Sequence, residues 1–579
     1  MSNNEFIEEL TKNCDDIQGN VLADILSQNA ETEYLKRHGL SNSCIDRETF
    51  KSKVPLVTYD DIKPDIERIY NGDFSPILCA QSISEFWVSS GTSSGQQKLI
   101  PTTDAEIQRR YHLSAAVLPY INERINELEA GEGKVLTMLM TRFEIVTPGG
   151  LLARPCFTSL FKNPIFCNDK PYPFNTKTSP IEAIHCSDHF QSIYTQLLCG
   201  LYQRHDVTRI QAIWASTLVS VIRLLDRHYS ELCHDISTGT LSPKITNPSL
   251  RARILNTFMD HPETELADCI KRECSGRDWA GILKRIWPKL KFLETSVTGS
   301  MAPYIPILDH YSGGLPFLSL KYSSSECDFG FNLNPICDPY DISYTIMPNI
   351  AYFEFIPLNV DTLGPNVKTV DLANVVVGQE YELVVTTYNG LYRYRLGDVL
   401  CPTGFYNSTP QFKILRRTDV VLSIDVEKTT ETELQGAIVK ASEILKPFDT
   451  IIIDYTSNAS IKNLPGHYVI YLELMSNISN NQENGVGPQV LEQCCLAMEN
   501  ALGLIYRVAR GNDFIGPLEI RVVSHGTFEK SKDYAISKGV CINQFKMPRC
   551  VNLVSMLELL DSRVVSAHFS PSAPRSGPI

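Results

Sequence analysis

The sequence predicts an α/β protein, in which a large N-terminal α/β domain of layered sheets with a β-rich subdomain precedes a small C-terminal α+β domain. At roughly 100–200 residues per domain, a chain of 579 residues is too long for a single core. Apolar β-branched runs alternate with helical patterns up to about residue 420, and the pattern changes near residue 425. We therefore place the large domain at residues 1–425, its β-rich subdomain at about 345–420, and the small domain at 426–579.

The large domain is expected to begin with an amphipathic helix, because Phe6, Leu10, Ile17, Val21 and Ile25 recur at helical spacing. Apolar runs then predict buried strands at Val135–Met140, Ile210–Trp214, Leu290–Val297 and Leu315–Tyr322. Helical periodicity marks the stretches Asp104–Leu128 and Ser216–Tyr229. Because strands and helices alternate, a layered α/β body follows.

Turn and capping signals organise the second half of the chain. The segments Glu382–Thr387 and Leu391–Leu400 flank Asn389–Gly390, a strong signal for a β-hairpin. Thr430 and Glu433 form a capping box that predicts a helix up to about Leu445. The remaining predicted elements are the strands Thr450–Tyr455, Tyr468–Leu474 and Leu518–Ser524 and the helix Gln489–Leu502. The Pro- and Ser-rich tail 570–579 is expected to be disordered.

Composition excludes several classes of function. The net charge of −13 repels phosphate backbones, so we expect no general binding to nucleic acid or to anionic membranes. The apolar runs are far shorter than the roughly 20 residues that cross a bilayer, and the N-terminus does not resemble a signal peptide. The 17 cysteines include no Cys-x-x-Cys pair. Scattered reduced thiols are typical of a cytoplasmic protein.

The segment Val88–Lys98, which reads Val-Ser-Ser-Gly-Thr-Ser-Ser-Gly-Gln-Gln-Lys, is a candidate anion-binding loop. Its glycines let the backbone wrap closely, and its hydroxyls and amide groups can donate to a phosphate. It lacks the Gly-x₄-Gly-Lys-Ser/Thr pattern of a Walker loop. Taken alone, an ordinary surface turn rich in Ser and Gly explains it equally well.

Two further segments support a ligand site. Lys321–Glu326 follows a predicted buried strand and places hydroxyls and a carboxylate at its carboxyl end, where ligands gather in open α/β sheets. The carboxylate could hold Mg²⁺, which bridges phosphate oxygens. Gly390–Asp398 ends with an acid that can accept hydrogen bonds from both hydroxyls of a ribose. Taken singly, Lys321–Glu326 is more simply explained as a hydroxyl-rich loop, and Asp398 as a strand acid paired with an arginine.

Together, these three segments resemble the adenylate-forming enzymes related to acyl-CoA synthetases and firefly luciferase. More closely, the chain is similar to the plant acyl-acid amido synthetases of the auxin-responsive Gretchen Hagen family over about residues 5–570. The short sequence motifs that carry this resemblance are Val54–Val57, Ser89–Pro101, Thr298–Met301, Tyr352–Phe355, Tyr392–Val399, Gly404–Asn407, Gly526–Phe528 and Gln544–Arg549.

The resemblance implies an ATP- and Mg²⁺-dependent ligase that activates a carboxylic acid as an acyl-adenylate and then transfers it to an amino acid. It implies a mobile small domain that swings between the two half-reactions. By motif, the nucleotide-binding residues are Ser89, Ser90, Thr92, Thr298, Tyr322, Ser325, Glu326, Asp398, Lys428 and Lys546. Among these, Lys546 and Glu326 would be catalytic, with Glu326 also the metal ligand.

The resemblance also locates the two substrates. The acyl-acid pocket would include Val117, Trp214 and Leu320, and the amino-acid site would include Glu519, Ile520, Arg521, Val522 and Val523. Relatives that use benzoate-type acids carry an arginine at the position that an ungapped reading gives to Val117. An apolar lining without a cation favours a larger hydrophobic acid, such as an indole-alkanoic or jasmonate-like plant hormone.

One departure from the family pattern concerns Ser323, which stands where the family motif Tyr-Gly-Ser-Ser-Glu has glycine. A positive φ at this position would make serine cost on the order of 1 kcal/mol. Two other functions stay open: a thioester-forming acyl-CoA synthetase, and a non-catalytic acid-binding descendant of the enzyme. We expect a monomer whose partners are small molecules. Residue patterns do not identify the acid or the amino acid.

Overall fold

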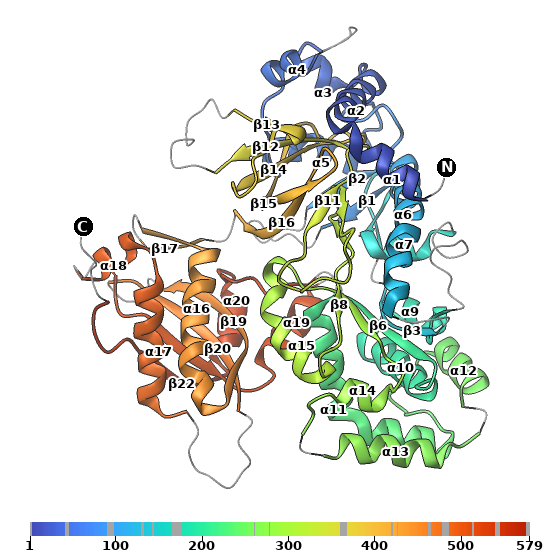
Figure 1. Cartoon of the computed structure of the whole chain (residues 1–579), viewed down its shortest axis with the longest axis vertical. Coiled ribbons are helices and arrows are strands. Elements are labelled where there is room, and N and C mark those ends of the chain that lie inside the picture. The colour runs from blue at the N-terminus through green and yellow to red at the C-terminus, as the bar shows by residue number, and fades with distance from the viewer. Residues whose placement is uncertain are drawn as a thin grey trace. The chain divides into compact units, whose positions relative to one another are not determined.

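The computed structural model describes residues 3–40, 46–89, 98–128, 133–141, 144–164, 176–259, 261–276, 278–358, 368–418, 421–424, 427–460, 462, 465–476, 486–511, 515–538 and 545–574. The chain divides into two compact units, Met1–Leu415 and Arg416–Ile579 (Figure 1). The domain boundary predicted between residues 425 and 426 lies outside the described residues, as does the end of the predicted tail from residue 575.

Strands of the first unit form three sheets among the described residues. They are β1 (Glu85–Val88), β2 (Leu99–Thr102), β3 (Lys134–Met138), β4 (Ile145–Val146), β5 (Leu152–Pro155), β6 (Val207–Trp214), β7 (Phe292–Ser296), β8 (Phe317–Leu318), β9 (Lys321–Ser323), β10 (Asp328–Phe331), β11 (Tyr344–Ile346), β12 (Tyr352–Pro357), β13 (Val370–Asp371), β14 (Tyr381–Thr386), β15 (Tyr394–Tyr406) and β16 (Thr409–Arg417). The sheet β3-β6-β7-β8 is parallel. The others have the orders β2-β1-β5-β4 and β13-β12-β14-β15-β16-β11-β10-β9.

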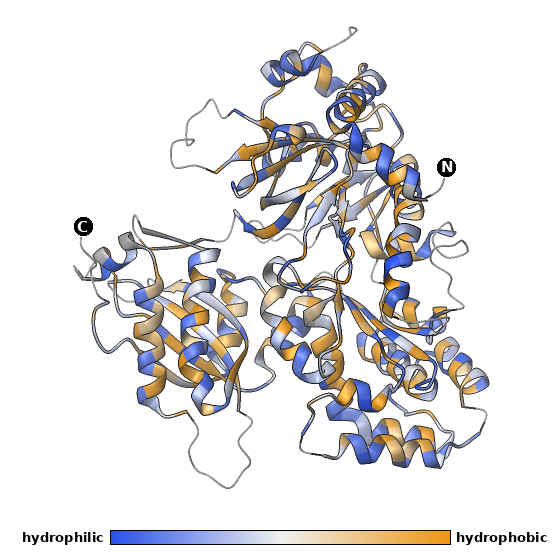
Figure 2. Cartoon of the chain, in the orientation of Figure 1, coloured by the Kyte–Doolittle hydropathy of each residue, from blue (hydrophilic) through white to orange (hydrophobic). Residues whose placement is uncertain are grey.

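Helices cover these sheets and share one hydrophobic core with them (Figures 1 and 2). The longer ones are α1 (Asn3–Lys12), α2 (Cys14–Gln28), α5 (Tyr59–Tyr70), α6 (Asp104–Ile125), α10 (His189–Tyr202), α11 (Ala215–Thr238), α12 (Pro248–Thr257), α13 (Thr264–Cys274) and α15 (Ile305–Ser312); the shorter ones include α3 (Glu33–Arg37), α4 (Arg47–Lys53), α7 (Cys156–Lys162), α9 (Ile181–His185) and α14 (Ile282–Ile286). None of the described helices combines the length and apolar character needed to cross a bilayer.

Two predicted elements differ from the structure. The single N-terminal helix is two helices, α1 and α2, separated at Asn13. The prediction of one strand at Leu315–Tyr322 is wrong, because this segment contributes to two strands in different sheets. β8 belongs to the parallel sheet, whereas β9 belongs to the large antiparallel sheet. Ser319 and Leu320 lie between them. An unbroken apolar run predicts extended backbone, but it carries no information about a strand that changes sheets.

The predicted hairpin is confirmed, because β14 and β15 pair as antiparallel neighbours. Gly390 in its turn has φ +93°, and a Cβ there would lie 2.3 Å from the carbonyl oxygen of Leu78. Arg393 also has a positive φ, 46°, and its buried guanidinium makes two 3.0 Å hydrogen bonds to the carboxylate of Glu354. The regular strand therefore begins at Tyr394, after this strained residue.

The second unit is an α+β fold around the sheet β19-β20-β21-β22. Its elements are β17 (Val421–Ile424), β18 (Glu427–Thr430), α16 (Glu431–Leu445), β19 (Thr450–Ser460), β20 (His467–Ser476), α17 (Pro488–Ala501), α18 (Leu504–Gly511), β21 (Glu519–Val523), α19 (Thr527–Ser537), α20 (Val554–Asp561) and β22 (Val564–Phe569). The predicted helices in this region correspond to α16 and α17.

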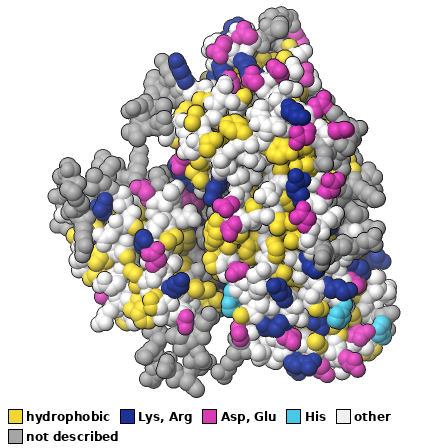
Figure 3. Space-filling view, in the orientation of Figure 1, with side chains coloured by type: hydrophobic (Ala, Val, Ile, Leu, Met, Phe, Trp, Pro, Cys, Tyr) yellow, Lys and Arg dark blue, Asp and Glu magenta, His cyan; other side chains and the backbone are white. Residues whose placement is uncertain are grey.

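On the face of the molecule shown in Figure 3, basic side chains lie among acidic ones.

Candidate active site

The candidate phosphate loop connects two adjacent strands. β1 and β2 pair as an antiparallel hairpin, and the backbone N–H of Ser89 donates to the carbonyl oxygen of Lys98 at 2.8 Å. Ser90 and Thr92 lie outside the described residues. The ammonium of Lys98, a buried residue, is 3.4 Å from the hydroxyl of Tyr394 and packs near the rings of Tyr394 and Tyr59. The loop thus leaves and returns at one defined place with a cation at its base.

Tyr322 and Asp398 are brought together by a hydrogen bond. The hydroxyl of Tyr322 on β9 donates to Oδ2 of Asp398 on β15 at 2.6 Å. Tyr322 is buried and Asp398 is half-buried, so the tyrosine fixes a carboxylate that stays accessible on one side. Two residues that the family resemblance predicts as nucleotide ligands therefore belong to one local structure.

A third predicted residue, Thr298, joins this group through Tyr344 of β11. The hydroxyl of Tyr344 lies 3.2 Å from Oγ1 of Thr298 and 2.7 Å from Oγ of Ser319, and its ring lies 5.9 Å from that of Tyr322. Burial raises the pKa of Tyr344, which keeps its hydroxyl protonated as a donor. Sequence reasoning missed Tyr344, because an isolated tyrosine in an apolar strand is usually a core residue.

The turn that carries Ser325 and Glu326 is held by a buried arginine. Arg110 of α6 donates to the carbonyl oxygens of Ser324 at 2.8 Å and Ser325 at 3.1 Å. Its Nε donates to Glu106 at 2.9 Å, and its guanidinium stacks 4.6 Å from the ring of Trp87. Arg110 therefore fastens the backbone of the turn. The i, i+4 spacing of Glu106 and Arg110 on a mostly apolar helix face could have signalled this role.

Glu326 suits a metal that is shared with phosphate oxygens. It is buried, and its backbone N–H donates to Oγ of Ser324 at 3.2 Å. No cluster of three or more His, Cys, Asp or Glu side chains that could hold a metal occurs in the described part of the chain. Mg²⁺ commonly binds through one or two carboxylates together with substrate phosphates, so one carboxylate fits. Ser323, at the end of β9, is exposed and is absent from the described non-glycine residues with positive φ, so the serine at this position adds no backbone strain.

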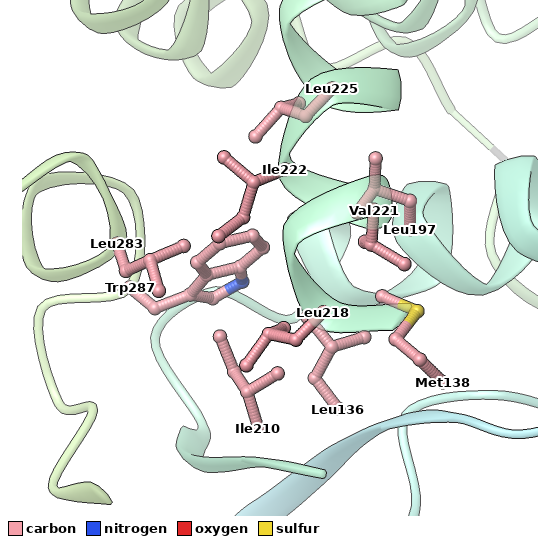
Figure 4. A pocket seen from close by; sticks show the side chains of 10 residues that line it. All are labelled: Leu136, Met138, Leu197, Ile210, Leu218, Val221, Ile222, Leu225, Leu283 and Trp287. Atoms are coloured by element: carbon pink, nitrogen blue, oxygen red, sulfur yellow. The ribbon is translucent and has the colours of Figure 1, made fainter. Parts of the chain in front are cut away.

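The three predicted acyl-pocket residues lie within or against one hydrophobic core. Val117 is fully buried on α6, and Trp214 at the end of β6 and Leu320 before β9 are half-buried. A separate apolar pocket lies between β3 and β6 and the helices α10 and α11 (Figure 4). Its lining contains none of the three predicted residues. The assignment of Val117, Trp214 and Leu320 to the acid stays a prediction.

In the second unit, Lys546 stands at the start of a segment that is fastened to β19. Oγ1 of Thr456 donates to the carbonyl oxygen of Pro548 at 2.5 Å, and the guanidinium of Arg549 donates to Asp454 at 2.6 Å and stacks 4.2 Å from the ring of Tyr455. Lys546 itself is exposed. The other predicted lysine, Lys428, lies on β18 opposite Ser423 of β17, and its side chain is outside the described atoms.

The predicted amino-acid segment Glu519–Val523 is strand β21, paired in parallel with β20 and antiparallel with β22. The carboxylate of Glu519 accepts two hydrogen bonds from Arg521, at 2.9 and 2.8 Å, and lies 3.0 Å from Nε2 of His467. Burial raises the pKa of Glu519, but the bonds from His467 and Arg521 outweigh it and lower the pKa. The segment therefore carries an ionised carboxylate on a regular strand.

Comparison with known proteins identifies the family. The GH3 family N-terminal domain matches residues 3–317, the central domain residues 344–417 and the C-terminal domain residues 432–554. The chain belongs to the GH3 family. These matches confirm the membership in the Gretchen Hagen family that the sequence motifs predicted.

The GH3 relatives match the whole chain. Indole-3-acetic acid-amido synthetase GH3.4 of Arabidopsis thaliana is 52% identical over 581 residues, which cover 99% of this chain and 95% of the relative. The probable indole-3-acetic acid-amido synthetase GH3.2 of Oryza sativa subsp. japonica is 50% identical, with 99% and 94% covered. The solved structure of the GH3.15 acyl acid amido synthetase is 43% identical with a TM-score of 0.91, and 99% of this chain and 98% of that chain are covered. The predicted α/β fold class is confirmed.

Proposed function

We propose that this chain is an acyl-acid amido synthetase, which uses ATP to join an amino acid to a carboxylic acid through an acyl-adenylate. The proposal rests on full-length similarity to relatives named as amido synthetases. The observation that carries it to a site is the hydrogen bond between Tyr322 and Asp398, with Thr298 close by through Tyr344. These residues suit a nucleoside, because an oriented carboxylate can accept from two ribose hydroxyls.

The reaction has two steps. An oxygen of the acid carboxylate attacks the α-phosphorus of ATP, a P–O bond to the β-phosphate breaks, and pyrophosphate leaves. The amine of the amino acid then attacks the acyl carbon, the bond to AMP breaks, and the amine loses a proton to give an amide. Both carboxylate and triphosphate are anions, so the catalyst must chiefly supply donors and positive charge.

The residues divide these tasks. Ser89 and the loop after it would hold phosphate oxygens, while Glu326 would help to hold Mg²⁺, which neutralises charge on the phosphates. Arg110 would keep the turn of Ser325 and Glu326 in place through its two carbonyl contacts. Lys546 would supply positive charge during adenylation.

The relatives suggest the class of acid. Two are named for indole-3-acetic acid, and a further solved structure of the GH3.15 enzyme is described as a complex with 2,4-DB. We propose an aromatic alkanoic acid of the auxin type as the first candidate, with jasmonate-like acids as the alternative from sequence. A cytoplasmic location and a monomeric state are proposed from composition and family resemblance alone.

A panel assay tests the function. The purified chain is incubated with ATP, Mg²⁺ and single acids, and acid-dependent pyrophosphate exchange is measured. Amino-acid mixtures or CoA are then added, and products are identified by mass spectrometry. We expect an amide. A thioester without an amide would favour the acyl-CoA synthetase function, and no exchange with any acid would favour a non-catalytic acid-binding protein.

A further inference from the structure

A lysine–aspartate pair joins β9 and β10, and its lysine, Lys321, stands in the chain between the predicted pocket residue Leu320 and the predicted nucleotide residue Tyr322. The ammonium of Lys321 on β9 is 2.6 Å from Oδ2 of Asp328 on β10 and donates to Oγ of Ser114 on α6 at 3.0 Å. Asp328 and Ser114 are buried, whereas 29% of the Lys321 side chain is exposed. The ammonium is therefore held in place at the edge of the core with one side still accessible.

The position of this pair follows from how α6 runs along β9. Arg110, Ser114 and Val117 lie on the same buried face of α6, at the spacing of successive helical turns. Arg110 contacts Ser324, and Ser114, one turn later on α6, contacts Lys321, three residues earlier in the chain than Ser324. Helix α6 therefore runs in the opposite direction to the segment 321–324. The next turn of α6 carries Val117, and the next residue before Lys321 is Leu320.

The same geometry explains why the pair is anchored. Oδ1 of Asp328 lies 3.6 Å from Nη1 of Arg110, the arginine that fastens the turn of Ser324 and Ser325. Lys321 also packs 5.4 Å from the ring of Phe331, its neighbour across the two strands. Asp328 thus joins the nucleotide end of the site to the ammonium of Lys321.

An ammonium has three N–H donors. Among the described residues, Ser114 accepts a hydrogen bond from Lys321 and the carboxylate of Asp328 lies at ion-pair distance, so at least one N–H of the ammonium remains for a ligand. A purely hydrocarbon acid that covered this N–H would leave it without an acceptor, which costs free energy because a buried charged donor loses its hydrogen bond to water. An acid with an oxygen at this point would satisfy it. Sites built to bond a polar group reject analogues that lack it, which makes such a donor a source of specificity.

We propose that Lys321 is a specificity-determining residue of the acyl-acid site, and that it selects acids that carry an oxygen acceptor in addition to the reacting carboxylate. The proposal rests on the proposed function and makes it more specific, because an acid site is assumed next to the nucleotide. It also changes the expectation of a wholly apolar lining, since the cation comes from strand β9 rather than from α6.

The test compares acids that differ by a single oxygen. Phenylacetic acid is compared with its three ring-hydroxylated isomers, and indole-3-acetic acid with its 5-hydroxy derivative. For each acid, kcat/KM is measured by pyrophosphate exchange and Kd by calorimetry. In the wild type, at least one hydroxylated acid is expected to be preferred. Lys321→Met should lower that preference roughly 10- to 100-fold, whereas Lys321→Arg, which keeps a donor, should retain much of it.

Matched variants protect the test from trivial outcomes. Lys244→Met removes another lysine of the first unit that pairs with a carboxylate, Glu231, at 2.6 Å, and should leave the preference unchanged. Lys321→Met/Asp328→Asn removes both charges, so that no buried carboxylate loses its lysine, and should behave like Lys321→Met.

An equal preference in wild type and Lys321→Met would overturn the proposal, as would a wild type that prefers the unsubstituted acid in every pair. Acid binding without exchange would refute the synthetase function alone, because the Kd values still decide whether Lys321 selects.

Discussion

Tyr322→Phe tests the nucleotide site with the smallest possible change, the removal of one oxygen. The hydroxyl donates to Asp398 at 2.6 Å, and hydrogen bonds to charged groups contribute about 1.5–3 kcal/mol. Asp398 is half-buried, so water can replace part of the lost bond, and the effect should lie near the lower end of that range. About 1.5 kcal/mol corresponds to a roughly tenfold weaker affinity for ATP, because the carboxylate is no longer oriented.

The assay is the Kd for ATP by calorimetry, with the melting temperature recorded in parallel. Tyr194→Phe is the matched control, because Tyr194 donates to Asp235 at 2.8 Å in the same unit and no site residue is involved. Both variants should lose similar stability, but only Tyr322→Phe should lose affinity. An unchanged Kd in a folded Tyr322→Phe, or an equal loss in Tyr194→Phe, would refute the reasoning.

Three further predictions concern other parts of the chain. Lys546→Ala should slow acid-dependent pyrophosphate exchange by roughly 10²–10³ and affect amide formation from supplied acyl-adenylate far less; equal losses would contradict a role in adenylation. Arg393→Ala should lower the free energy of unfolding by about 3–5 kcal/mol, because the fully buried carboxylate of Glu354 would lose its ion-pair partner. A loss below about 1 kcal/mol in denaturant unfolding would argue against this ion pair. Burial raises the pKa of Cys14 to about 11 from 9.0. Its thiol therefore ionises first in the unfolded state, so stability is full below pH 9.0 and falls towards pH 11, by about 1 kcal/mol at pH 10. Unfolding free energies at pH 8 and 10 should show a smaller pH dependence in Cys14→Ala.

Several features could be predicted from the sequence because their causes are local. Helical periodicity located α6 and α11, and Asn389–Gly390 located the turn between β14 and β15. The sequence motifs predicted the GH3 family, which the matches confirm. Each of these signals depends on residues within a few positions of one another, so one-dimensional reading is sufficient.

Only the tertiary structure could reveal the contacts that assemble the candidate site. Tyr322 and Asp398 are 76 positions apart, and Arg110 and Ser324 are 214 apart. The change of sheet between β8 and β9 places Tyr322 near β15, although the apolar run through it predicts one strand. Periodicity identifies a buried face but not the strand that covers it. The sequence therefore determined most of the elements and the family, whereas long-range contacts such as those of Arg110 and Ser114 on α6 decided which charges meet.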